Sequence, residues 1–281
     1  MIANPFEYTV PATLDEALKL AGDGSAKILA GGMSLIPLMK LRLAAPENVI
    51  DLGRIPGLNQ ITESGGIVKI GAMATHHAVE TSPLIRGKCP LLAETAGHIG
   101  DMQVRNMGTI GGSIAHADPA ADYPAALVAL EANIHLRSAS SERLVEAGSF
   151  FLDAFTTALE PGEIVVDVQV AAEKSSEGYK YAKVPHPASG FPVVGVAVRV
   201  MQSAGKITLA RIGVTGMASH AFRARNAEQM LESGSSIADA SAVVGEGVDA
   251  NTDLYASADY RRHLARVHAA RALAAAMART T

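Results

Sequence analysis

Apolar positions in the first part of the chain switch between the spacing of helices and that of buried strands. Thr13-Leu14-Asp15-Glu16 is a capping box, and the apolar face after it predicts a helix that ends at Gly22. Strands are predicted at residues 26–30, 48–52, 67–71, 133–137 and 164–170. Helices are predicted to start near residue 35 and to cover residues 75–79, 90–99, 125–130 and 150–155. Strands and helices therefore mix along this part of the chain.

The last part of the chain separates its strands from its helices. Strand-like runs at residues 179–184, 193–201 and 206–214 are joined by turns, which favours an antiparallel sheet. Helices are predicted at residues 222–231, 237–248 and 257–279, the last of them amphipathic and packed on a surface. We therefore predict an α+β fold whose smaller C-terminal domain combines a three-stranded antiparallel sheet with a helical bundle.

Two breaks in the pattern divide the chain. The polar stretch at residues 171–178 has no hydrophobic pattern of its own, so we place a boundary there, between domains at residues 1–173 and 174–281. Gly53, Pro56 and Gly57 mark an earlier break. They divide the first domain into lobes of about residues 1–57 and 58–173.

Two glycine pairs are the candidate ligand-binding motifs of the chain. Gly31-Gly32 follows a predicted strand and precedes Ser34, a candidate helix cap, and Gly111-Gly112 lies in a second loop. Glycines let main-chain N–H groups lie against an anionic ligand, so a side chain added at Gly32 or Gly111 is expected to block that ligand. Either pair taken alone is equally consistent with an ordinary turn. The two together favour a ligand with two phosphates.

Carboxylates follow the second glycine pair. Asp118 and Asp122 would repel phosphates, so they are better suited to accept hydrogen bonds from the hydroxyls of a sugar or polyol. Pro119 and Pro124 are expected to keep this segment out of a helix until Ala125.

Charge and composition exclude several classes of protein. A net charge of −4, from 24 basic and 28 acidic residues without a basic run, argues against nucleic-acid binding. No signal-peptide pattern and no apolar run of about 18 residues is found, so we expect a cytoplasmic protein without membrane insertion. Cys89 is the only cysteine, which excludes an internal disulfide and a cysteine-ligated iron–sulfur cluster or zinc site in this chain.

Motifs of catalysis and metal binding are missing from the sequence. His76, His77, His98 and His116 do not have the spacing of a zinc site. Neither Gly-x-Ser-x-Gly nor the glycine patterns of Rossmann and P-loop proteins occur. We therefore predict no catalytic residue and no metal ligand.

The two glycine loops, with this spacing, resemble those of the flavin-binding medium subunits of molybdenum hydroxylases, the carbon monoxide dehydrogenase and xanthine dehydrogenase family. The resemblance covers nearly the whole chain. It implies a two-lobed FAD-binding domain of the PCMH type, as in the vanillyl-alcohol oxidase group, with FAD held non-covalently. It also implies a large partner subunit with the molybdenum cofactor and a small one with 2Fe-2S clusters, assembled as a dimer of heterotrimers.

The resemblance assigns places along FAD to particular residues. The pyrophosphate would lie across the two loops, Ile99 on the adenine side and Asp122 near the nucleotide end. Phe191 would stack against the isoalloxazine ring, although it is also consistent with the start of a core strand. The cofactor-binding residues predicted in this way are Leu29, Ala30, Gly31, Gly32, Met33, Ser34, Leu35, Ile36, Ile99, Thr109, Ile110, Gly111, Gly112, Ser113, Asp118, Asp122, Val165, Lys183 and Phe191.

Two positions depart from the commonest family pattern. Ser113 replaces an asparagine after the second glycine pair but still offers a hydroxyl. Gly190 replaces an acidic residue before Phe191, which leaves open the pose of that loop and the electron acceptor that approaches it.

The resemblance implies an FAD-carrying oxidoreductase subunit that accepts electrons from the 2Fe-2S clusters of a partner and passes them to an external acceptor. Two alternatives stay open, a stand-alone FAD oxidase or dehydrogenase and a flavin-free scaffold protein of the same fold. A flavin spectrum would exclude the scaffold. Flavin reduction by substrate without partners would favour the oxidase.

Overall fold

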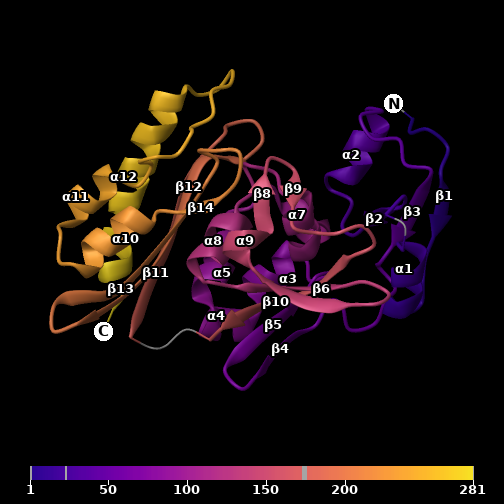
Figure 1. The fold of residues 1–281 in the computed structure, drawn as a ribbon, viewed down its shortest axis with the longest axis horizontal. Coiled ribbons are helices and arrows are strands. Elements are labelled where there is room, and N and C mark those ends of the chain that lie inside the picture. Colours follow the sequence, from indigo (N-terminus) through magenta and orange to yellow (C-terminus); the bar gives the residue numbers. More distant parts are fainter. Residues whose placement is uncertain (1, 23, 173–175, 281) are drawn as a thin grey trace.

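The computed structural model describes residues 2–22, 24–172 and 176–280. Three parts lie side by side in chain order, with the N-terminal lobe at one end, a central lobe and the C-terminal domain at the other end (Figure 1). The predicted α+β architecture is confirmed. The predicted domain boundary between residues 173 and 174 lies outside the described residues.

The N-terminal lobe is a small parallel sheet with two helices. Its elements are β1 (Glu7–Thr9), α1 (Leu14–Leu20), β2 (Lys27–Leu29), α2 (Leu35–Lys40) and β3 (Asn48–Asp51), with the strand order β1-β3-β2. The predicted capping box is present, because the Thr13 side chain accepts a hydrogen bond from the N–H of Glu16. The Glu16 carboxylate in turn accepts one from the N–H of Ala12. Strand β2 ends at Leu29, just before the first glycine pair.

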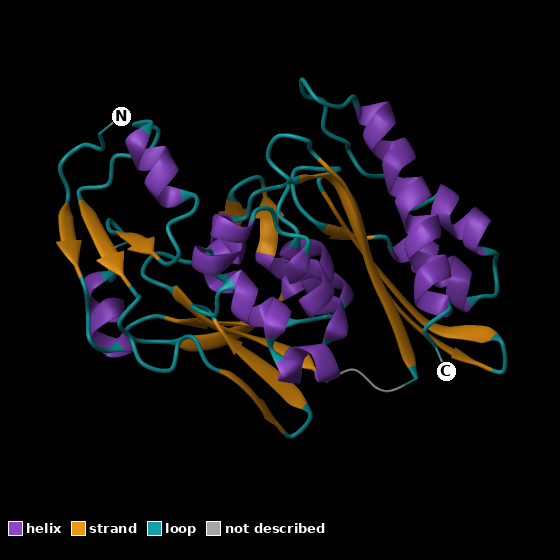
Figure 2. Ribbon diagram, turned by 180° about the vertical axis from the view of Figure 1, so that it is seen from behind, coloured by secondary structure: helices purple, strands orange, loops and turns teal. Residues whose placement is uncertain are grey.

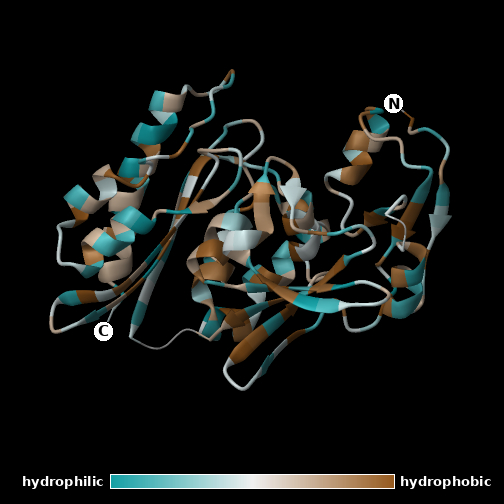
Figure 3. Cartoon of the chain, in the orientation of Figure 1, coloured by the Kyte–Doolittle hydropathy of each residue, from teal (hydrophilic) through white to brown (hydrophobic). Residues whose placement is uncertain are grey.

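The central lobe is an antiparallel sheet covered by helices. Its strands are β4 (Ile61–Ser64), β5 (Ile67–Gly71), β10 (Ile164–Ala171), β6 (Asn133–Arg137) and β7 (Glu142–Glu146), in that spatial order. Its other elements are α3 (His76–Thr81), α4 (Pro83–Lys88), α5 (Pro90–Gly97), α6 (Met102–Met107), α7 (Ile110–His116), α8 (Tyr123–Ala129), α9 (Ala147–Phe150), β8 (Phe151–Asp153) and β9 (Thr156–Thr157). Apolar residues are concentrated in these strands and in α5 and α8, which form the largest core (Figure 3).

The C-terminal domain is a sheet with helices on its outer face. The antiparallel order is β11 (Glu177–Pro185), β12 (Pro192–Ser203), β13 (Lys206–Thr215) and β14 (Phe222–Arg223). Helices α10 (Arg225–Glu232), α11 (Ile237–Ala242) and α12 (Ala258–Met277) cover one face of it, and the central lobe packs on the other (Figure 2). Gly213 permits this packing, because a Cβ atom there would lie 2.0 Å from the carbonyl oxygen of Ala125 in α8.

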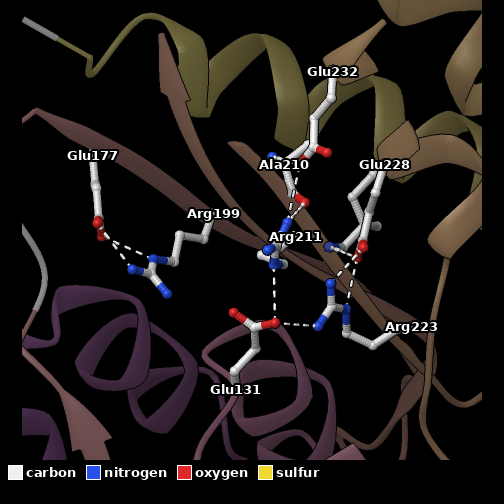
Figure 4. A network of polar contacts seen from close by, with 9 residues as sticks. Glu131, Glu177, Arg199, Ala210, Arg211, Arg223, Glu228 and Glu232 are labelled. Carbon is white, nitrogen blue, oxygen red and sulfur yellow. Dashed lines mark hydrogen bonds and ion pairs between the residues drawn. The ribbon is translucent and has the colours of Figure 1, made fainter. Parts of the chain in front are cut away.

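An ion-pair network joins this domain to the end of α8 (Figure 4). The Glu131 carboxylate lies 2.7 Å from Arg223 and 3.1 Å from Arg211. Arg223 also pairs with the buried Glu228, and Arg211 with Glu232. The sheet is thereby tied to α8 on one side and to α10 on the other.

Several local predictions are wrong. The second glycine pair, expected in a loop, lies in α7, and the helix expected at residues 237–248 ends at Ala242. The segment predicted as a helix at residues 150–155 contains the end of α9 followed by β8. Helix α8 starts at Tyr123 rather than Ala125, because Pro124 fits the first turn of a helix. The C-terminal sheet has a fourth strand, β14, at the position where a helix was expected to begin. In the described part of the chain, no helix is both long and apolar enough to span a bilayer.

Candidate functional site

The two glycine loops meet at the junction between the N-terminal and central lobes. A Cβ atom on Gly31 would lie 2.0 Å from the carbonyl oxygen of Met107, at the end of α6. A Cβ atom on Gly112 would lie 3.3 Å from that of Ala30. The structure therefore brings together two loops that are far apart in the sequence, and glycine is needed at Gly31 for their close approach.

The first glycine loop offers unpaired main-chain donors. No described residue accepts a hydrogen bond from the N–H groups of residues 31–35. Gly32 has a φ of +75°, and Ser34 precedes α2 without using its side chain as a cap. Successive free N–H groups beside a turn of this kind form a concave surface suited to an anion.

The second glycine loop, in contrast, uses its donors within the protein. The N–H of Gly111 donates to the carbonyl of Ala72 at 2.8 Å, and that of Gly112 donates to the Thr109 hydroxyl at 3.1 Å. A Cβ atom on Gly111 would lie 2.4 Å from the Cβ of Ala72. This glycine therefore allows α7 to pack closely on the chain after β5, and the contact of Gly111 with a ligand stays a prediction.

A buried histidine packs beside the second glycine loop. His76 is 5% exposed, and its Nδ1 lies 3.3 Å from the hydroxyl of Tyr123. Its main-chain N–H donates to the carbonyl of Gly108, 2.9 Å away. Desolvation, with a smaller contribution from Arg105, lowers the pKa of His76 to about 4. A neutral imidazole thus packs at the start of α3.

Asp122 and Lys183 form a buried ion pair between the central lobe and the C-terminal domain. The Asp122 carboxylate accepts hydrogen bonds from the Tyr181 hydroxyl at 2.7 Å and from Lys183 Nζ at 2.9 Å. Burial raises the pKa of Asp122, while Lys183 and Tyr181 oppose that shift. Tyr181 was missed from the sequence, although its position two residues before Lys183 in a strand places both side chains on one face.

Lys183 also anchors the turn that carries Phe191. Its Nζ donates to the carbonyl of Gly190 at 2.8 Å, and the N–H of Gly190 donates to the carbonyl of His186. The Phe191 side chain is 45% exposed and lies outside the core, unlike that of a buried strand residue. A Cβ on Gly190 would lie 3.3 Å from the Cα of Gly100. Ile99 precedes Gly100 in the chain, and its predicted place on the adenine side stays a prediction.

The other predicted residues have ordinary structural contacts. Asp118 accepts a hydrogen bond from the N–H of Ala120 at 2.8 Å within its own turn. Val165 is buried in the central core and pairs with Leu136 across the sheet. Cys89 is buried, as expected of a packing thiol. Among the described residues, no group of histidine, cysteine and carboxylate side chains is arranged to hold a metal ion.

Comparison with known protein families matches nearly the whole chain. Residues 4–172 match the family described as the FAD binding domain in molybdopterin dehydrogenase. Residues 178–276 match the CO dehydrogenase flavoprotein C-terminal domain.

Individual relatives are similar in sequence over nearly the whole length of both chains. The carbon monoxide dehydrogenase medium chain of Hydrogenophaga pseudoflava is 40% identical, covering 99% of each chain. The 6-hydroxypseudooxynicotine dehydrogenase complex subunit alpha of Paenarthrobacter nicotinovorans is 36% identical over 98% of this chain and 95% of that protein. A solved structure of the Hydrogenophaga pseudoflava carbon monoxide dehydrogenase superposes with a TM-score of 0.96 over all of both chains, at 40% identity. Quinoline 2-oxidoreductase from Pseudomonas putida 86 superposes over all of both chains with a TM-score of 0.93, at 32% identity.

Proposed function

Because this chain belongs to the family of FAD-binding medium subunits of the molybdenum hydroxylases, we propose that it takes electrons from 2Fe-2S clusters of a partner subunit and passes them to an external acceptor. FAD supplies the redox chemistry when it is bound, because it exchanges electrons both singly and in pairs. The chain supplies the position and surroundings of that cofactor. We assign no catalytic acid, base or nucleophile to this chain.

The observation that carries the proposal is the row of free N–H groups at residues 31–35, set against the second glycine loop. These donors, with the hydroxyls of Ser34 and Ser113, would hold the pyrophosphate of FAD. Gly111 would contribute indirectly, by fixing α7 against Ala72 so that Ser113 faces the site. Of the predicted cofactor-binding residues, we place the strongest interactions in this first loop.

We propose that the cofactor extends from these loops toward the junction with the C-terminal domain. Phe191 is exposed there, and the Asp122–Lys183 pair holds its turn in place. An exposed aromatic ring on an anchored turn is suited to shield one face of the isoalloxazine ring from water. We also propose domains at residues 1–173 and 174–281, so that the flavin would lie near the boundary between them.

We propose a large subunit with the molybdenum cofactor and a small subunit with 2Fe-2S clusters as partners, in a dimer of heterotrimers. The single cysteine supports this division, since the chain cannot ligate an iron–sulfur cluster by itself. The names of the relatives support it too, because several of these proteins are medium chains or subunits of dehydrogenases.

The test is to purify the chain with the proteins that travel with it and to measure flavin, molybdenum and iron. We expect FAD on this chain, with molybdenum and iron on two others. A colourless, correctly folded chain would support a flavin-free scaffold and contradict the proposal. Flavin reduction by substrate in the isolated chain, at the rate of the complex, would instead support a stand-alone oxidase.

A further inference from the structure

A second exposed turn stands against the turn that carries Phe191. Residues 253–256 lie in the connection between α11 and α12, and the Tyr255 ring meets the His186 ring edge to face, with centroids 4.2 Å apart and planes at 72°. Tyr255 is 66% exposed and its neighbour Leu254 is 98% exposed. Such exposure of two large apolar side chains in a short turn is not explained by packing in the C-terminal domain.

This second turn is closed by hydrogen bonds within it. The Asp253 carboxylate accepts hydrogen bonds from the N–H groups of Tyr255 at 2.9 Å and Ala256 at 3.0 Å. The N–H of Asp253 donates to the carbonyl of Ala256 at 3.1 Å. These three hydrogen bonds link residues 253–256 to one another. They thereby fix the direction in which the Tyr255 side chain projects from the turn.

A buried arginine connects the second turn to the strand that follows Phe191. Arg261, at the start of α12, pairs with Asp253 and is 5% exposed. It also donates to the carbonyl of Val193 at 2.6 Å and to that of Gly216 at 2.7 Å. Val193 is two residues beyond Phe191, so one guanidinium group holds the bases of both turns in fixed relation.

The contact with Tyr255 reaches the tip of the Phe191 turn through His186. The His186 Nδ1 accepts from the N–H groups of Ala188 and Ser189, each at 3.3 Å. The carbonyl of His186 accepts from the N–H of Gly190 at 2.9 Å. The imidazole therefore organises the turn from within, and the Tyr255 ring limits the rotation of that imidazole.

We propose that Tyr255 is a positioning residue that fixes the turn at residues 186–191 and thereby holds Phe191 over the bound flavin. The inference rests on the proposed function, because it assigns the flavin to the Phe191 side of the site. Lys183 holds the Gly190 end of this turn, and Tyr255 holds its His186 end. Loss of the Tyr255 ring would leave the turn attached but free to shift.

The first test needs no flavin. Hydrogen exchange of the amides of Ala188, Ser189 and Gly190 is measured in the full chain and in the variants Tyr255→Ala, Tyr255→Phe and Leu254→Ala. Tyr255→Ala should speed exchange about 2- to 12-fold, which corresponds to the loss of the free energy of one edge-to-face ring contact. Tyr255→Phe keeps the ring, and Leu254→Ala changes the same turn without touching His186, so both should exchange like the parent. Unchanged exchange in Tyr255→Ala would overturn the inference.

The second test measures the consequence for the cofactor. In the same variants loaded with FAD, Tyr255→Ala should weaken FAD binding by a similar factor and increase the quenching of flavin fluorescence by iodide. Faster exchange with unchanged FAD affinity and quenching would show that the contact orders the turn but does not serve the flavin, which overturns the inference alone. A parent chain that binds no FAD would overturn the proposed function as well, and the exchange data would then stand as a separate result on the turn.

Discussion

His76 shows how burial fixes the charge of a single side chain beneath the site. Its pKa is lowered from 6.5 to about 4, so the unfolded chain binds a proton at this position before the folded chain does as the pH falls. The stability that His76 contributes is therefore complete above pH 6.5 and is lost between pH 6.5 and about pH 4.

We predict that replacing His76 by glutamine makes the free energy of unfolding less sensitive to acid. The difference between pH 7 and pH 4 should shrink by about 3 kcal/mol, the free-energy equivalent of that pKa shift. Denaturant titrations of both proteins at several pH values measure this. Comparison with the parent removes the contribution of Asp122, whose raised pKa acts in the opposite direction. Equal pH dependence in both proteins would mean that His76 titrates normally.

Phe191 is the residue whose predicted role is easiest to separate from folding. Because its side chain is 45% exposed, its truncation should leave the core intact. We predict that Phe191→Ala weakens FAD binding about 5- to 150-fold, equivalent to roughly 1–3 kcal/mol of lost burial and stacking. Equilibrium titration with FAD measures the affinity, and stopped-flow reoxidation measures the acceptor reaction. Unchanged affinity and reoxidation would place Phe191 away from the ring.

Gly111, in the second glycine loop, has a packing role that can be tested apart from ligand binding. Since a Cβ on Gly111 would lie 2.4 Å from that of Ala72, Gly111→Val should lower the melting temperature of the flavin-free chain. The loss should be about 1–3 kcal/mol of stability or more. If thermal unfolding without FAD is unaffected while FAD binding is lost, Gly111 contacts the ligand after all.

At the scale of elements, the ion-pair network between α8, β13, β14 and α10 offers a matched comparison. Glu228 is buried, pairs with Arg223 and accepts from the N–H of Ile212, whereas Glu131 is partly exposed. We predict that Glu228→Gln costs about 3 kcal/mol, since it breaks a buried pair. Glu131→Gln should cost less than about 1 kcal/mol, since solvent screens its interactions. Urea unfolding of the two variants checks the order, and equal losses would refute it.

Sequence periodicity predicted the elements whose local signals agree with their packing. Thr13 caps α1 as its motif indicates, and β5, β6 and β10 lie where apolar alternation places them. It failed at β8, where Phe151 pairs with Thr157 in a short hairpin that has no repeating pattern. It also failed at the second glycine pair, which was expected in a turn but lies in α7, packed closely against Ala72.

The candidate site was partly predictable for the same reason. The two glycine loops carry a local signal, and the structure brings them together. Tyr181 has only its strand spacing from Lys183 as a local signal, and Tyr255 has none, because their partners Asp122 and His186 come from distant positions in the chain. Such pairs depend on how the C-terminal sheet docks on α8.

At the scale of the whole molecule, we propose that the site extends over all three parts of the chain. The N-terminal lobe would contribute its free N–H groups, the central lobe α7 and Asp122, and the C-terminal domain Lys183 and the Phe191 turn. Cofactor binding should therefore stabilise all three parts together. We predict that saturating FAD raises the melting temperature of the full chain in a single transition. Separate transitions, with one part unaffected by FAD, would contradict this.

The central claim is that this chain holds FAD non-covalently on the first glycine loop. The most direct measurement is the amount of FAD bound per chain after reconstitution, determined from the absorption of flavin released by acid. We predict one FAD per parent chain, all of it released into solution, with no flavin left on the precipitated protein. A folded chain that retains no FAD, or one that keeps flavin attached after precipitation, would contradict the claim.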